Sequence, residues 1–154
     1  MDKQQLLDTW EINNRIDLYL LEAIAREHFD DELSSKGRNV REQFAHIHNV
    51  RLMWLKAAMP TLLPGQTKIE KDDAADKASL ARYLIESGNA ISELLSAAAE
   101  TGKVKGFKPH VTAFLGYLIA HDAHHRSQII IALKQSGHKI DQKIGFGLWE
   151  WGSR

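Results

Sequence analysis

The residues best suited to chemistry are two histidines, His121 and His125, within the apolar stretch from Phe114 to Ile131. In an α-helix of about 3.6 residues per turn, side chains that are four positions apart stand above one another on one face. Both imidazoles can therefore reach a single point in space, as a metal ion requires. Apolar residues share this helix face, so we expect the pair to point into the protein core.

The spacing of His121 and His125 does not by itself establish a metal site. It is also compatible with two hydrogen-bonded core histidines or with two surface histidines. The residue after His121 is Asp122 rather than glutamate, so the HExxH pattern of zincin-type proteases is missing. The neighbouring His124 is offset by about 60° from His121, which places it at the edge of the helix bundle. A third ligand from another helix would favour a metal site.

A further candidate ligand lies in the predicted helix 40–58, which contains His46 and His48. His46 falls beside the apolar face of this helix, and we expect it to point inward. His48 lies about 200° further round the helix, which predicts a position near the boundary with solvent. A lone histidine on an apolar face is also compatible with a hydrogen-bonded core residue. Of the two, His46 is the better candidate ligand.

The composition excludes several classes of function. The chain of 154 residues has the size of one domain, 1–154, and its 20 basic and 20 acidic residues cancel. This charge balance gives no support for a nucleic-acid partner or an anionic membrane surface. The absence of cysteine rules out disulfides, thiolate zinc sites and a cysteine nucleophile. No apolar run has the length of a membrane span, so we expect a cytoplasmic protein.

The hydrophobic pattern predicts an all-α protein with four long helices. Apolar residues recur at three- and four-residue steps, and breakers separate the periodic stretches. The predicted helices are Gln4–Glu27, Val40–Ala58, Ser79–Thr101 and a last helix from Pro109 in its first turn to Gln135 or Ser136. The linker 59–77 is long enough to return the chain along a helix, so the second and third helices can run parallel. A four-helix bundle is the expected architecture.

Two asparagines in the first helix and the aromatic C-terminal tail are expected to have structural roles. Asn14 falls on the apolar stripe of the first helix with Asn13 beside it, and we expect hydrogen-bonded or water-facing amides at both positions. The tail IGFGLWEWGSR concentrates large aromatic residues, which we expect to pack over one end of the bundle.

Three segments resemble a known family, the DinB/YfiT-like superfamily of four-helix metal-binding proteins. They are FAHIHNVRLMWL, HDAHHRSQI and the closing GLWEWG. The resemblance covers nearly the whole chain and implies an up-down-down-up bundle with a divalent metal ion. By motif position the ligands are His46, His121 and His125, with His48 and His124 as neighbours that could substitute. Members of the family are often dimers, so the resemblance also implies a homodimer.

Three imidazoles leave coordination positions for water or a ligand, which is typical of a catalytic metal. The metal can activate water for hydrolysis, or bind a small thiol as the nucleophilic thiolate. The resemblance favours the second route, because relatives include thiol-dependent S-transferases and isomerases that act on small molecules. Zinc, nickel, iron and manganese all suit the ligand set. Gln43 and Gln128 lie about one turn from His46 and His124, where they could donate hydrogen bonds to ligand histidines, although exposed polar residues are the commoner case.

Two other hypotheses remain open from the sequence. The protein could be a stress-related metal-binding protein without turnover, which a closed coordination sphere would favour. It could also be a purely structural bundle whose histidines bind nothing, which unchanged stability after metal removal would favour. The catalytic residues and the substrate are not encoded in the pattern.

Overall fold

The computed structural model describes residues 2–154, and most of these residues are helical, as the sequence predicts. The four long helices are α1 (Lys3–Ala23), α2 (Val40–Ala58), α3 (Lys77–Thr101) and α4 (Val111–Gln135). The shorter elements are 3-10 helices at Arg26–His28, Pro60–Leu62 and Trp151–Ser153, the strands β1 (Lys103–Val104) and β2 (Phe107–His110), and α5 (Gln142–Gly147). Each helix within residues 2–154 is too short or too polar to span a lipid bilayer.

Polar caps determine where the helices begin. At the start of α2, the Asn39 side chain accepts a hydrogen bond from the Glu42 backbone N–H at 2.9 Å. The Glu42 carboxylate in turn accepts one from the Asn39 backbone N–H at 3.0 Å, and the two bonds together form a capping box. Asp76 caps α3 by accepting from the backbone N–H of Ser79 at 2.8 Å. A fixed first turn of α2 also fixes the direction in which His46 points.

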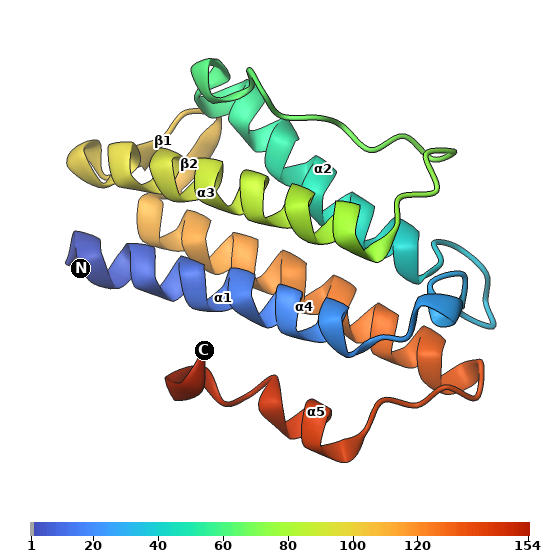
Figure 1. Ribbon diagram of the computed structural model, residues 1–154. Coiled ribbons are helices and arrows are strands. Elements are labelled where there is room, and N and C mark those ends of the chain that lie inside the picture. The colour runs from blue at the N-terminus through green and yellow to red at the C-terminus, as the bar shows by residue number, and fades with distance from the viewer. Residues whose placement is uncertain (1) are drawn as a thin grey trace.

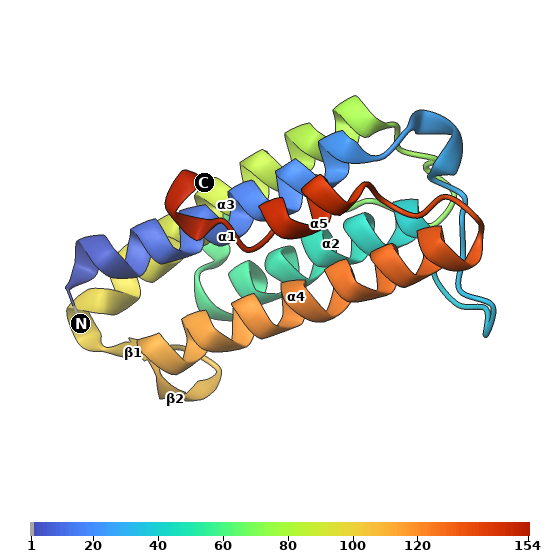
Figure 2. The same cartoon turned by 90° about the horizontal axis from the view of Figure 1, so that it is seen from below.

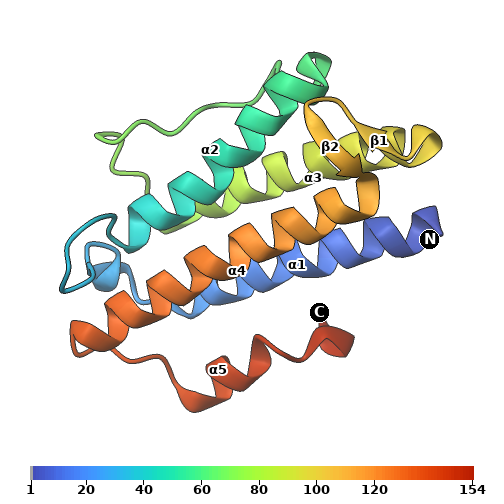
Figure 3. The same ribbon diagram turned by 180° about the vertical axis from the view of Figure 1, so that it is seen from behind.

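The long helices lie side by side, and each of α1 and α2 packs against both α3 and α4. The connection between α2 and α3 runs back along the molecule, so that both helices begin at the same end (Figures 1 and 3). The C-terminal segment with α5 then returns beside α1 (Figures 1 and 2), where the Arg154 guanidinium lies 3.8 Å from the centre of the Tyr19 ring. This arrangement places His46 of α2 opposite His121 and His125 of α4.

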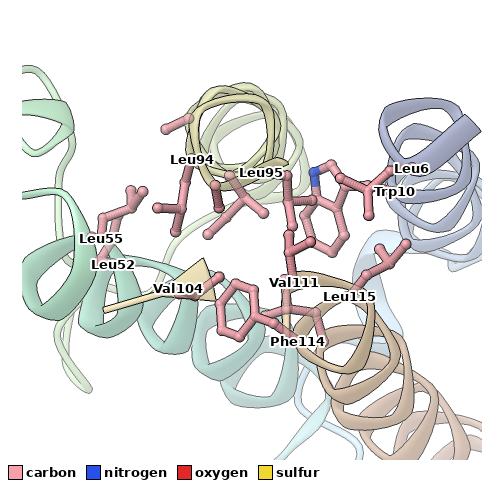
Figure 4. Packing of buried hydrophobic residues seen from close by; sticks show 14 residues of the cluster. Leu6, Trp10, Leu52, Leu55, Leu94, Leu95, Val104, Val111, Phe114 and Leu115 are labelled. Carbon is pink, nitrogen blue, oxygen red and sulfur yellow. The ribbon is translucent and has the colours of Figure 1, made fainter. Parts of the chain in front are cut away.

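The core consists of two hydrophobic clusters. One cluster gathers residues from all four long helices, including Trp10, Leu55, Leu95 and Phe114 (Figure 4). The other contains Leu20, Phe44, Leu84 and Ile129, among other buried side chains. On each of the long helices, buried polar residues fall between the positions that contribute to the two clusters. These polar residues are Asn13, Asn14 and Asp17 on α1, His48 and Arg51 on α2, Ser87 on α3, and Asp122, His125 and Arg126 on α4.

A short β-hairpin before α4 differs from the all-helical prediction. Strands β1 and β2 pair antiparallel, with Val104 opposite Phe107 and the turn passing through Gly106 at φ 85°. Pro109 therefore lies in β2 and not in the first turn of α4, which begins at Val111 with His110 as its N-cap. The strands have too few residues to show an alternating pattern, so periodicity alone does not reveal them.

The aromatic tail also differs from the prediction that it packs over an end of the bundle. It runs beside α1, where Gly147 is buried against the Tyr19 side chain. Leu148 packs on the core, but Phe146 and Trp149 are 63% and 81% exposed. The number of aromatic residues in the tail does not indicate which of their rings pack against the rest of the protein.

Helices α1 and α3 approach closely at Gly88. The Trp10 indole N–H donates to the Gly88 carbonyl at 2.9 Å, and a Cβ atom at Gly88 would lie 2.3 Å from Asn14 Nδ2. Real Cβ atoms do not approach other heavy atoms so closely, so only glycine fits here. The Asn14 side chain cannot simply move away, because its Oδ1 accepts a hydrogen bond from Arg51 at 2.7 Å.

We expect Gly88→Ala to destabilise the protein by about 1–3 kcal/mol, because the added methyl group displaces Asn14 from the buried polar groups. The matched control is Gly116→Ala on α4, whose Cβ would have no neighbour within 4 Å. This control should be neutral or stabilise by up to about 1 kcal/mol through helix propensity alone. Urea unfolding of both variants measures the difference. Equal stability of the two variants would contradict the close approach.

Candidate metal centre

Three imidazoles from two helices meet beside the buried polar residues. His46 comes from α2, and His121 and His125 come from successive turns of α4. The ring centres lie 5.4 Å apart for His46 and His121, and 4.5 Å apart for each of the other two pairs. One nitrogen from each ring lies within 4.8 Å of the others. Because zinc–imidazole bonds are about 2.0–2.1 Å long, small side-chain rotations bring all three donors to one ion.

The orientation of these rings also suits a shared ion. The planes of the three rings meet at angles of 46°, 65° and 59°. A metal ion lies close to the plane of each imidazole that binds it, because the nitrogen lone pair lies in that plane. Three ring planes that are tilted relative to one another can meet at a single point. The observed tilts are therefore compatible with one ion bound by all three rings.

The side chains of His28, Asp31 and His138 form a second group of possible ligands. Their ligand atoms lie close enough together to hold an ion, but their two rings are not oriented to bind one. The His28 and His138 rings are stacked at 3.6 Å with only 8° between their planes. Parallel stacked rings have no common plane in which one ion could face both lone pairs. In addition, His138 Nδ1 lies 2.6 Å from an Asp31 carboxylate oxygen, so this nitrogen already has a partner. The first cluster is therefore the better candidate for a metal centre.

Gln43 orients His125 through a chain of hydrogen bonds. The Gln43 amide group donates to Gln128 Oε1 at 2.7 Å, so its own oxygen is left to accept. That oxygen lies 2.7 Å from His125 Nδ1, which must therefore carry the proton. Nε2 of His125 then presents its lone pair to the cluster. The Gln128 amide group also lies 2.9 Å from Nε2 of His124, which is outside the cluster. Of the two glutamines, only Gln43 therefore contacts a candidate ligand directly, and this ligand is His125 rather than His46.

Asp122 has the corresponding role for His121. A carboxylate oxygen of Asp122 lies 3.4 Å from His121 Nδ1, and its other oxygen accepts from Asn13 at 2.8 Å and from Arg51 at 3.0 Å. Burial alone would raise the pKa of Asp122, but the Arg51 guanidinium and the hydrogen bond with His121 lower it overall. Asp122 therefore stays ionised at neutral pH, and it favours the His121 tautomer that leaves Nε2 free for a metal.

The carboxylate of Asp122 is one part of a buried ionic network that the sequence did not reveal. Arg51 also donates to Asp17 at 2.8 Å, and Arg126 donates to the other oxygen of Asp17 at 2.5 Å. Burial, and then the charge of Asp122, raise the pKa of Asp17 to about 7. One signal was available in the sequence, because Arg51 follows Ile47 by one helical turn and so falls on the buried face of α2.

Burial keeps two of the three candidate ligands neutral. It lowers the pKa of His46 to about 4, with the nearby charges of Arg38 and His121 adding to the effect. It lowers the pKa of His125 to about 3, with further contributions from the neighbouring histidines and Arg38. A metal ion binds only the neutral imidazole, so protons do not compete at these two rings near neutral pH.

His48 and His124 lie outside this cluster. His48 is fully buried, which contradicts its predicted position near solvent. Its two ring nitrogens lie 3.0 Å from the Tyr83 carbonyl oxygen and 2.7 Å from the Thr67 carbonyl oxygen. The α2–α3 connection, to which Thr67 belongs, covers this side of α2, an effect that helix geometry alone could not predict. His124 is exposed, as expected for the edge of the bundle.

The two histidine clusters give opposite expectations for metal binding. We expect wild-type protein to retain about one ion per chain after dialysis, and His121→Ala to retain less than about a tenth of this. His138→Ala is the matched control and should retain the full amount, because its stacked ring is not a ligand. Elemental mass spectrometry measures all three. Metal loss in His138→Ala, or two ions per wild-type chain, would contradict the assignment.

Comparison with known proteins agrees with the resemblance noted in the sequence. The model of the DinB family matches residues 1–143, which is nearly the whole chain. Searches of curated proteins and of solved structures give no match. The matched region includes the four long helices and all three histidines of the cluster. The chain therefore belongs to the DinB family.

Proposed function

We propose that this DinB-family protein binds a divalent metal ion through His46, His121 and His125, and that the metal acts on a small molecule. The observation that carries the proposal is the convergence of three tilted imidazoles with no fourth protein ligand. Within residues 2–154, no other histidine, aspartate or glutamate joins the cluster. Three protein ligands leave at least one position for water or substrate, which is the usual composition of a catalytic zinc site.

The exposure of the three rings supports access from solvent. His125 is buried, whereas His46 and His121 are only partly buried. The cluster is therefore held from the inside by Gln43 and Asp122 and reached from the outside. His46 also lines a surface cavity of about 630 Å³, a volume within the range of small-molecule sites.

We propose a thiol-dependent S-transfer reaction, with hydrolysis as the other possibility for the same centre. A bound divalent metal would lower the pKa of a coordinated thiol or water and so supply a nucleophile near neutral pH. The thiol would come from a small molecule, because the chain has no cysteine. The protein residues hold the ligand rings in the required tautomers through Gln43 and Asp122, and they keep two of the rings unprotonated. Zinc, nickel, iron and manganese all remain candidates for the metal.

The directions of the four long helices also fit the expected family arrangement. We propose the up-down-down-up bundle of the family, which is supported by the common starting end of α2 and α3 and by their long connection (Figure 1). The homodimer, the single domain, the cytoplasmic location and the absence of nucleic-acid and membrane partners stay predictions from the sequence.

Cobalt-substituted protein tests the proposed reaction. We expect 2-mercaptoethanol to produce a sulfur-to-cobalt charge-transfer band, and the metal-loaded protein to accelerate alkylation of this thiol by iodoacetamide about tenfold or more at pH 6.5. The reason is that metal binding deprotonates the thiol well below its ordinary pKa, so that more of it is the nucleophilic thiolate at pH 6.5. His125→Ala should abolish both effects, and His138→Ala should preserve them.

An intact cobalt site that binds no thiol would contradict the S-transfer proposal. Acceleration of ester hydrolysis by the same protein would then favour the hydrolase. Failure of both reactions would favour the alternative of a stress-related metal-binding protein without turnover.

A further inference from the structure

A cavity beside His46 has one wall on α2 and another on the α2–α3 connection. On the α2 side, Arg41, Glu42, Ala45, His46 and Asn49 fall on one helix face, and Arg38 lies two residues before the first helical residue, Val40. The opposite wall is the segment from Lys68 to Ala75. The cavity therefore adjoins the metal centre through His46, which belongs to both.

Hydrogen bonds fix the connection in place, so the cavity is formed before any ligand binds. The Asn49 side chain donates to the Ile69 carbonyl at 2.8 Å and accepts from the Ile69 backbone N–H at 3.0 Å. Arg41 donates to the carbonyl oxygens of Ala74 and Ala75, and Ile69 is buried. A preformed cavity reduces the ordering cost of binding.

The charged residues of the cavity are not balanced by one another. The Glu42 carboxylate belongs to the capping box, and Glu70 binds Lys68 at 2.8 Å. Arg41 is held by Asp30 at 3.3 Å as well as by the two carbonyl oxygens. The side chains of Arg38 and Lys71, in contrast, have no hydrogen bond or ion pair with another side chain of the described residues 2–154. Four basic side chains line the cavity against the two acidic ones of Glu42 and Glu70, so the lining has a net positive charge.

Arg38 and His46 line the same cavity. A small molecule in this cavity can therefore contact the guanidinium group with one end and reach the proposed metal position beside His46 with the other. A guanidinium also matches the planar geometry of carboxylate and the oxygens of phosphate or sulfonate.

We propose that Arg38 and this cavity recognise a carboxylate, phosphate or sulfonate group of the small molecule that reacts at the metal centre. The inference rests on the proposed function, because it takes His46, His121 and His125 as the reacting centre. Arg38 is a specificity-determining residue in this account. Its exposed position predicts that recognition weakens as salt concentration rises.

Two thiols that differ in one group test the inference on cobalt-substituted protein. The probes are 2-mercaptoethanesulfonate and 2-mercaptoethanol, and the charge-transfer band gives the affinity of each. At low ionic strength we expect wild-type protein to bind the sulfonate about five- to tenfold more tightly than the alcohol. Arg38→Gln should reduce this ratio to about one, and Arg38→Lys should retain part of it.

Lys105→Gln is the matched control, because it removes one positive charge from the exposed hairpin turn, at the end of the molecule away from the start of α2 (Figure 1). It should leave the ratio unchanged. A ratio near one in the wild type, or the same ratio in Arg38→Gln as in the wild type, would overturn the inference.

A second measurement separates this inference from the proposed function. Inorganic phosphate is titrated into metal-free protein while the backbone amide NMR signals of Asn49 and Ile69 are followed. We expect saturable shifts in the wild type and in Lys105→Gln, and at least about fivefold weaker binding in Arg38→Gln. If cobalt protein binds neither thiol but phosphate behaves in this way, only the thiol chemistry fails. If phosphate causes no Arg38-dependent shift, anion recognition fails.

Discussion

The structure depends on the ionic network of Asp17, Arg51, Asp122 and Arg126 that crosses the middle of the helices. Charged groups removed from water are stable only when each has oppositely charged and hydrogen-bonding partners. The two carboxyl groups and two guanidinium groups come from three different helices, and each carboxyl group lies beside at least one guanidinium group. They can meet only if α1, α2 and α4 have one particular offset along their axes. The network thus fixes the positions of α1, α2 and α4 along their axes. Apolar contacts in the two clusters alone would specify these positions less strictly.

The same register brings together the three histidines of the proposed metal centre. Asp122 contacts Arg51 with one oxygen and lies beside His121 with the other, so the charge that orders the core also orients a ligand. On α2, His46 lies just over one turn before Arg51, and the capping box holds the start of this helix. A displacement of α2 along α4 would separate Arg51 from its carboxylates and His46 from the α4 histidines together. Stability of the core and geometry of the site are therefore coupled through one set of contacts.

The helix bounds and the histidine cluster could be predicted from sequence patterns that are local to one helix. Periodicity and capping residues gave the bounds of α2, and they gave the ends of α3 and α4 to within a residue or two. The spacing of His121 and His125, together with the inward face of His46, indicated the cluster that the structure brings together. Asn13 and Asn14 were expected to be hydrogen-bonded or water-facing amides, and both are buried hydrogen-bonding groups of the core.

Features that depend on contacts between distant segments were not predictable in this way. Spacing along α2 places Arg51 on a buried face but does not identify its partners on α1 and α4. His48 was expected near solvent, yet the α2–α3 connection covers it, and its ring faces the carbonyl oxygens of Thr67 and Tyr83. The cavity beside His46 has the same origin, because the folded connection supplies one of its walls.

The central claim is that His46, His121 and His125 bind one metal ion together. X-ray absorption at the zinc K edge of protein loaded with one equivalent of zinc tests it most directly, with wild type measured beside His46→Ala. In the wild type we predict three imidazole nitrogens and one further oxygen or nitrogen ligand, all at about 2.0–2.1 Å from the zinc. In the variant we predict the loss of one imidazole. A wild-type spectrum without imidazole scattering, or an unchanged imidazole count in His46→Ala, would contradict the claim.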